Sequence, residues 1–253
     1  MPSVVTLLSP VGGIGKSTLS LHLAQQLAGW GKRTLLIDVS GSAPVLDIML
    51  GVDESMIYSL TDVAKGLCSL SHALLSPASL PLLSLLPAAV GDEPDDGMLA
   101  LALKEARGCS EFDYMIVDAA KEIYTTVRAC SDQVILLTDP RPSSLRASEA
   151  YASFAEDVDS FILTYASFSR EGVEREDSIV DIADQLSLPL LGVLPYAPML
   201  RTLSGIPRSS PYAVALDNVT RRIMGERIPL LKKVPLEGMS RRYYIERRGK
   251  NKL

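Results

Sequence analysis

The segment from Ser9 to Thr18, SPVGGIGKST, contains the residues of this 253-residue chain that are best suited to chemistry. It follows an apolar run and precedes a helical pattern, which is the setting of a phosphate-binding loop. Gly12, Gly13 and Gly15 lack Cβ, so the backbone N–H groups of this stretch, including that of Ile14, are expected to approach phosphate oxygens closely.

Two side chains complete the expected nucleotide site. Lys16 supplies a positive charge for the β- and γ-phosphates, and the hydroxyl of Ser17 is a hard oxygen ligand suited to Mg²⁺. The helix that starts there adds unpaired N–H groups and the positive end of its dipole. Pro10 stands where the G-x-x-x-x-G-K-[ST] pattern has its first glycine, and a glycine-rich turn is the alternative interpretation. The segment predicts binding of ATP, or a closely similar nucleoside triphosphate, with Mg²⁺.

Carboxylates end two of the apolar runs. Asp118 closes YMIVD and could hold Mg²⁺ through water, while Asp38 closes TLLID and could orient metal or water. The alternative for both is a helix cap or a turn residue. We expect Lys16, Asp38 and Asp118 to be the catalytic set.

The elements that must position these residues alternate along the chain. Strands are expected where short runs are rich in Val, Ile and Leu, which is typical of strands covered on both faces. These strands are 4–8, 34–38, 82–86, 114–118, 133–138, 161–164 and 190–194. The expected helices are 16–28, 98–107, 143–156, 176–186 and 212–224. The alternation predicts a three-layer α/β P-loop NTPase fold, with a mostly parallel sheet of about seven strands and helices on both faces. In such sheets, ligands bind at the carboxyl ends of the strands.

Composition narrows the class of protein. Hydrophobic residues make up 47% and charged residues 22%, which supports a packed core, and the net charge of −5 gives no indication of extensive nucleic-acid binding. Three scattered cysteines fit a reducing cytoplasm and argue against a zinc site or a disulfide framework. No apolar run reaches the roughly 18 residues that a membrane span needs, and the N-terminus is expected to be a strand and not a signal peptide. We expect a cytoplasmic protein.

Five segments of the chain, in their order and spacing, resemble the MinD/ParA family of P-loop ATPases: GGIGKST, LLIDVSGSAPVLDIMLG, MIVDAA, LLTDPRPSSLR and GVLPYAPMLR. The serine-proline before the double glycine is similar to the TadZ/CpaE-like pilus-assembly branch of that family. The resemblance implies a nucleotide-dependent homodimer that organises the position of a cellular assembly, such as a division site or a pilus. It also implies phosphate and metal contacts from the loop through Thr18, with Ser17 and Asp118 at the metal, and an adenine-lining loop at Pro195.

Several positions depart from the family pattern. The family's signature Lys before the double glycine, which reaches the partner's phosphates, is Val11 here, and the second Asp of its Asp-x-Asp is Ser40. The Pro-Ala-Gly after the switch Asp is replaced by residues 120–122, Ala-Lys-Glu, and the base-reading Asn by Ser167. Losing a cation that stabilises the transition state can slow phosphoryl transfer by on the order of 10³-fold. We therefore expect nucleotide binding to persist and hydrolysis to be slow or absent, unless Lys121 replaces the lost charge.

The C-terminal part differs in charge, so we expect residues 1–225 to form the nucleotide-binding domain and residues 226–253 a basic tail. From Arg221 to Leu253 there are 11 Lys and Arg against 3 Glu. Such a tail could be solvated, could contact an anionic membrane or a polar assembly protein, or, with less support, could contact nucleic acid. A peripheral position at the inner face of the membrane is therefore one expectation. Two other functions remain open: a nucleotide-locked scaffold without catalysis, and a DNA-partition ATPase.

Overall fold

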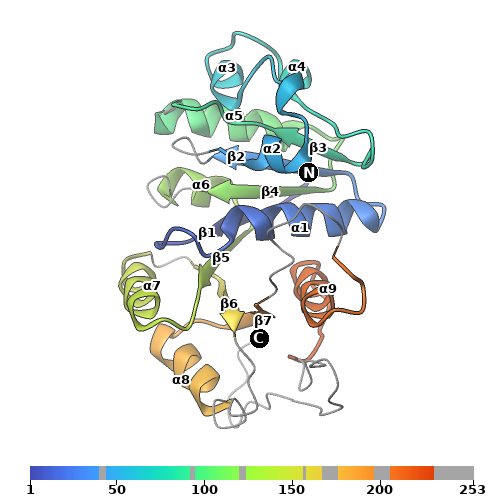
Figure 1. Cartoon of the computed structure of the whole chain (residues 1–253). Coiled ribbons are helices and arrows are strands. Elements are labelled where there is room, and N and C mark those ends of the chain that lie inside the picture. The colour runs from blue at the N-terminus through green and yellow to red at the C-terminus, as the bar shows by residue number, and fades with distance from the viewer. Residues whose placement is uncertain are drawn as a thin grey trace. The chain divides into compact units, whose positions relative to one another are not determined.

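The computed structural model has an α/β fold built on one sheet (Figure 1). It describes residues 1–39, 44–91, 95–119, 124–155, 158–166, 176–196 and 206–230. The sheet has seven strands in the order β3-β2-β4-β1-β5-β6-β7, and the strand pairs within each of two compact units are parallel. The units are Met1–Leu8 with Gly15–Val134, and Ser9–Ile14 with the chain from Ile135 onward. The expected P-loop NTPase fold is confirmed.

The strands form where the sequence is continuously apolar. Their residues are almost all buried, as expected for parallel strands covered on both faces. The strands are β1 Ser3–Leu8, β2 Thr34–Val39, β3 Leu83–Leu86, β4 Tyr114–Ala119, β5 Gln133–Thr138, β6 Ser160–Ala166 and β7 Leu190–Pro195. All seven were expected from the sequence, with boundaries that differ by at most two residues.

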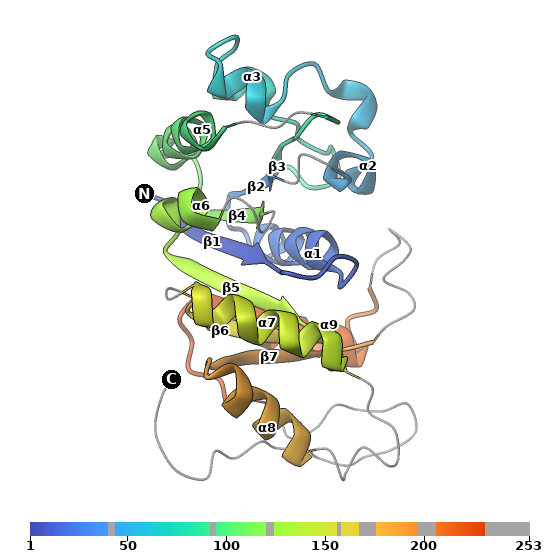
Figure 2. The ribbon, with the colours of Figure 1, turned by 90° about the vertical axis from the view of Figure 1, so that its left-hand side faces the viewer.

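In the first unit, helix α1 (Lys16–Gly29) packs along β1, β2, β3 and β4 through its buried leucines. Helix α5 (Asp96–Gly108) lies between α3 (Leu60–Ala64) and α6 (Tyr124–Cys130), as Figure 2 shows. The other helices of this unit are short: α2 Leu46–Leu50, the 3-10 helix η1 Asp53–Ser55, α3 Leu60–Ala64, α4 Leu70–Ala73 and α6 Tyr124–Cys130. The sequence patterns missed these short helices, because three to seven residues are too few to display a helical period.

In the second unit, β5, β6 and β7 are flanked by α7 (Pro142–Phe154), α8 (Glu176–Leu186) and α9 (Pro211–Ile223). Helix α9 packs on β7, and Figure 1 shows α7 and α8 on the other side of these strands. The contact between α9 and β7 is close at Gly192, where an added Cβ would lie 2.4 Å from Cγ2 of Val219. These three helices were also expected.

Across the ranges that the structure describes, no helix combines the length and the apolar character that crossing a bilayer would need. Most of the basic tail, from residue 231 onward, lies outside the described residues. The division into residues 1–225 and 226–253 therefore stays a prediction.

Candidate phosphate-binding site

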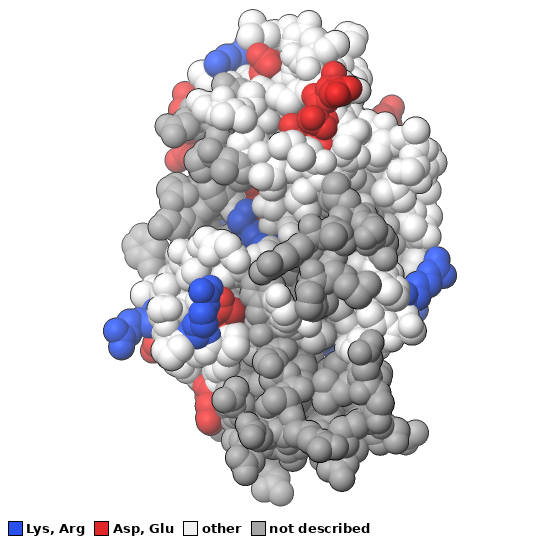
Figure 3. All heavy atoms as spheres, in the orientation of Figure 1, with Lys and Arg blue, Asp and Glu red and all other residues white. Residues whose placement is uncertain are grey.

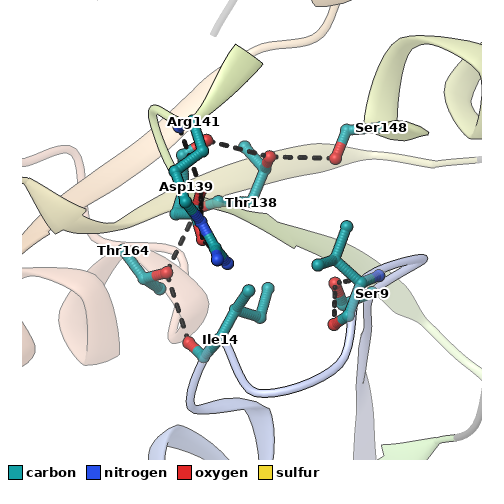
Figure 4. Close-up of polar contacts among 8 residues, drawn as sticks. Ser9, Ile14, Thr138, Asp139, Arg141, Ser148 and Thr164 are labelled. Atoms are coloured by element: carbon teal, nitrogen blue, oxygen red, sulfur yellow. Dashed lines mark hydrogen bonds and ion pairs between the residues drawn. The ribbon is translucent and has the colours of Figure 1, made fainter. Parts of the chain in front are cut away.

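The first part of the phosphate loop, Ser9–Ile14, belongs to the second unit. The Ser9 hydroxyl folds this stretch into a turn, because its Oγ lies 3.1 Å from both the backbone N and the backbone O of Val11 (Figure 4). Gly13 has φ +74°, a left-handed conformation that favours glycine. A Cβ added at Gly12 or Gly13 would meet nothing within 4 Å, so there is open space beside the backbone at both positions. An anion can therefore approach the backbone there.

The second part of the loop belongs to the first unit and begins helix α1. Gly15 is the N-cap residue with φ +84°, and no side chain caps the helix. The first turn carries no acidic residue and contains Lys16, Ser17 and Thr18. The unpaired N–H groups and the positive end of the helix dipole therefore favour an anionic ligand at this end.

Lys16 and Asp118 form an ion pair within the first unit. The Nζ of Lys16 donates to Oδ1 of Asp118, which is fully buried at the carboxyl end of β4. Ser20, one turn further along α1, lies with its Oγ 3.3 Å from the same oxygen. The sequence predicted both charged residues separately, but it did not reveal their pairing or the role of Ser20.

Asp38 lies beside Asp118 on the neighbouring strand. The two residues are register partners of β2 and β4, and the exposed fractions of Asp38 and Asp118 are 1% and 0%. Their adjacency follows from the parallel pairing, which brings the carboxyl ends of both strands to one edge of the sheet. Two of the three expected catalytic residues are thus next to each other, and the third, Lys16, binds one of them.

The donor set suits a hard cation such as Mg²⁺. Oδ2 of Asp118 is buried and has no hydrogen-bond partner among the described residues, although a buried carboxylate oxygen usually has one. A water molecule held by a metal ion would supply that partner. In the described part of the chain, no cluster of three or more His, Cys, Asp or Glu forms a metal cage. Mg²⁺ binds through few protein ligands when phosphates and waters supply the others, so the hydroxyl of Ser17 and the carboxylate of Asp118 fit such a site.

A hydrogen-bond network in the second unit holds Ser9–Ile14 against β5 and β6 (Figure 4). The buried hydroxyl of Thr164 on β6 lies 3.3 Å from the carbonyl O of Ile14 and 3.1 Å from that of Thr138. Ser148 on α7 donates to the Thr138 hydroxyl at 2.9 Å. These hydroxyls had no recognisable signal in the sequence, because Thr and Ser near strand ends have no distinctive spacing.

An ion pair directly follows Thr138. The carboxylate of Asp139 accepts from Nε and Nη2 of Arg141 at 2.5–3.0 Å and from the Arg141 backbone N at 3.0 Å. Burial acts to raise the pKa of Asp139, but the hydrogen bonds from Arg141 outweigh it and the pKa lies below its usual value. Asp139 therefore stays ionised. It lies in the motif LLTDPRPSSLR, in which the sequence analysis singled out no site residue.

The remaining predicted residues fall into two groups. Pro195 is buried at the end of β7 and pairs in register with Ala166 of β6, and its role at an adenine base stays a prediction. The other positions at which the chain departs from the family pattern, apart from Val11, lie outside the described residues: Ser40, Ala120, Lys121, Glu122 and Ser167. The proposal that Lys121 replaces a lost charge also stays a prediction.

Comparisons with known proteins agree with this geometry. Residues 5–205 match the family model described as the CobQ/CobB/MinD/ParA nucleotide binding domain. The septum site-determining protein MinD of Synechocystis is 31% identical, over 91% of this chain and 92% of that protein. The solved structures that are similar to this fold include two that contain MinD. The MinC:MinD cell division protein complex of Aquifex aeolicus has a TM-score of 0.79 at 27% identity, covering 95% of this chain and 99% of that chain. MinD of Pyrococcus horikoshii, complexed with Mg-ADP, has a TM-score of 0.73 at 25% identity, covering 90% and 100%. The chain therefore belongs to the MinD/ParA family of P-loop ATPases.

Proposed function

We propose that this protein is an ATP-dependent switch that takes part in positioning the cell-division site. The observation that carries the proposal is the uncapped, glycine-lined start of α1 with Lys16 bound to the buried Asp118. The relatives named septum site-determining protein, which match over nine-tenths of the chain, favour division over the other tasks of the family.

ATP and Mg²⁺ would occupy the loop between Ser9 and Thr18. The backbone N–H groups of Gly12, Gly13, Ile14 and Gly15 would bind the phosphates. Bound Mg²⁺ would neutralise charge on the phosphates during transfer, with the Ser17 hydroxyl as its ligand and Asp118 acting through water. The relative from Pyrococcus horikoshii, solved with Mg-ADP, supports this assignment.

Nucleotide binding would change the partner of Asp118. Lys16 is the only cation in the loop and is bound to Oδ1 of Asp118 in this structure. If the phosphates attracted the ammonium group, the carboxylate of Asp118 would lose its positive partner and would be available to accept a hydrogen bond from water that a bound Mg²⁺ would hold. Because Asp118 lies beside Asp38 at the strand ends, this exchange would couple the state of the nucleotide to the charge balance of this pair of carboxylates.

We further propose that the switch works as a homodimer and hydrolyses ATP slowly. Val11 carries no charge, although the family has its signature Lys at this position. Ser40 stands where the family has the second Asp of its Asp-x-Asp. Steady-state hydrolysis by the full chain, with and without anionic vesicles, tests this proposal. Turnover at the rate of ordinary P-loop ATPases would contradict it, whereas dimerisation on a non-hydrolysable ATP analogue with little turnover would support it.

Val11 also favours the second candidate, a scaffold in which ATP is a permanent structural ligand. The two candidates differ in the rate of nucleotide exchange. A switch releases its bound nucleotide when it is mixed with an excess of competing nucleotide, but a scaffold retains it. Release of a fluorescent ATP analogue from the wild-type chain over minutes would favour the switch. Retention over many hours would favour the scaffold.

The basic tail would bring the switch to an anionic membrane or to a polar assembly protein. On the face in Figure 3, the Lys and Arg atoms of the described residues form separate small groups. Nucleic acid has less support as the partner, because the net charge of the chain is −5. Co-sedimentation with vesicles containing anionic lipid, compared between the full chain and a chain lacking residues 241–253, tests the membrane role. Equal co-sedimentation of the two chains would exclude a membrane role for residues 241–253.

A further inference from the structure

The end of β5 presents a fixed guanidinium group. The side chain of Asp139 is 2% exposed and holds Arg141, whose side chain is 60% exposed. The contact uses Nε and Nη2, so the buried carboxylate fixes the plane of the guanidinium while much of the group reaches solvent. A guanidinium group held in one orientation is well suited to bind a phosphate, because less conformational freedom is lost for each hydrogen bond formed.

This strand end is tied to the phosphate loop. The Thr164 hydroxyl lies within 3.3 Å of the carbonyl oxygens of both Ile14 and Thr138, and Asp139 follows Thr138 directly in the chain. Figure 4 shows the Arg141 side chain extending from the end of β5 toward the loop segment that carries Ile14. The loop segment and the guanidinium belong to the same compact unit.

The loop itself carries little positive charge for a triphosphate. Ser9–Ile14 contains no Lys or Arg, and Lys16 is the only cation from Ser9 to Thr18. A nucleoside triphosphate remains anionic even with one bound Mg²⁺. A second cation near Ser9–Ile14 would therefore stabilise the bound triphosphate more than the diphosphate, since the terminal phosphate adds charge.

We infer that Arg141 is a further phosphate-binding residue, whose guanidinium contacts the terminal phosphate of the bound triphosphate, and that Asp139 is the residue that positions it. The inference rests on the proposed function, because it requires a triphosphate in the loop. It makes Arg141 a determinant of the preference for triphosphate over diphosphate. A merely structural Arg141, which only balances the buried Asp139, would leave that preference unchanged.

The test is calorimetric titration of the full chain with a non-hydrolysable ATP analogue and with ADP, both with Mg²⁺. Arg141→Ala is expected to weaken analogue binding about tenfold, the loss of one charge-assisted hydrogen bond, and ADP binding less than about twofold. Arg141→Lys should recover part of the loss, because Lys keeps the positive charge but lacks the planar guanidinium with its paired N–H donors. Arg146→Ala removes an exposed arginine from the same helix region and is the matched control, with both affinities unchanged.

Arg141→Ala leaves a buried carboxylate without its partner and could unfold the chain. The double variant Asp139→Asn with Arg141→Gln removes both charges and keeps hydrogen-bonding groups, and it should show the same selective loss. An unchanged ratio of analogue to ADP affinity in a folded variant would overturn the inference. If the analogue still binds and Lys16→Ala abolishes binding, the proposed function survives that result; if the folded wild type binds neither nucleotide, the proposed function itself fails.

Discussion

Asp118 is a fully buried carboxylate whose charge is balanced mainly by Lys16. Removing one partner of a buried ion pair is costly, because the other charge stays buried without compensation. Lys16→Ala should therefore lower the free energy of unfolding of the nucleotide-free protein by about 3 kcal/mol. Lys16→Met combined with Asp118→Asn should recover much of this loss. Urea denaturation measures both, and equal stabilities for the single and double variants would show that the pair is not coupled.

His22 on α1 makes the stability depend on pH. Burial lowers the pKa of His22 from its ordinary 6.5 to about 4, so the unfolded chain takes up a proton at a higher pH than the folded chain. The stabilising effect of the neutral ring is complete above pH 6.5 and is lost as the pH falls toward 4. Between pH 7 and pH 5 the loss should be about 2 kcal/mol. His22→Gln should flatten this dependence in urea denaturation at the two pH values, and an equally steep loss in the variant would assign the effect to other groups.

The candidate site residues with distinctive chemistry or spacing are the ones that the sequence could predict. Lys16, Ser17, Asp38 and Asp118 were predicted because a phosphate loop and strand-ending carboxylates have recognisable settings. Thr164 was missed as a site residue because its role depends on which strands become neighbours, and that is settled only by the folded sheet. The Asp139–Arg141 pair does have a local signal in the sequence, because two opposite charges stand two residues apart directly after a strand.

At the scale of the elements, the seven strands were predictable because each is a short apolar run, and the long helices because they follow such runs. The short helices were not, since their conformation depends on tertiary packing and capping. Helix α3 does carry a readable signal: Ser59 and Asp62 form a capping box, in which each side chain accepts from the other's backbone N–H. Strand order also had no sequence signal beyond the general rules for parallel sheets.

The packing of α9 on β7 gives a prediction at this scale. Gly192→Ala would place Cβ 2.4 Å from Cγ2 of Val219, whose β-branched side chain has little rotamer freedom in a helix. The substitution should destabilise the protein by about 2 kcal/mol, within the range for overpacking. Adding Val219→Ala should offset part of this, because it removes the clashing methyl group.

The matched control for that substitution is Gly108→Ala in the last turn of α5. A Cβ there meets nothing within 4 Å, so the stability should change by less than about 0.5 kcal/mol. Thermal unfolding of the wild type and these three variants measures all these effects. A Gly192→Ala protein as stable as Gly108→Ala would mean that α9 moves away from β7 without cost.

At the scale of the whole molecule, the proposed function depends on one event, the capture of a triphosphate by the loop between β1 and α1. The family, the fold and the geometry around Lys16 and Asp118 all point to it. The proposed slow turnover, dimerisation and membrane contact all presuppose it, so binding is the property to measure first.

Calorimetric titration of the folded full chain with ATP and Mg²⁺ is the most direct measurement. We predict saturable binding by the wild type at one site per chain and a loss of at least about 100-fold in affinity for Lys16→Ala, since that variant lacks the only cation of the loop. Lys32→Ala, in the turn after α1, is the control and should bind as the wild type does. No detectable binding by the folded wild type, or equal binding by the wild type and Lys16→Ala, would contradict the account.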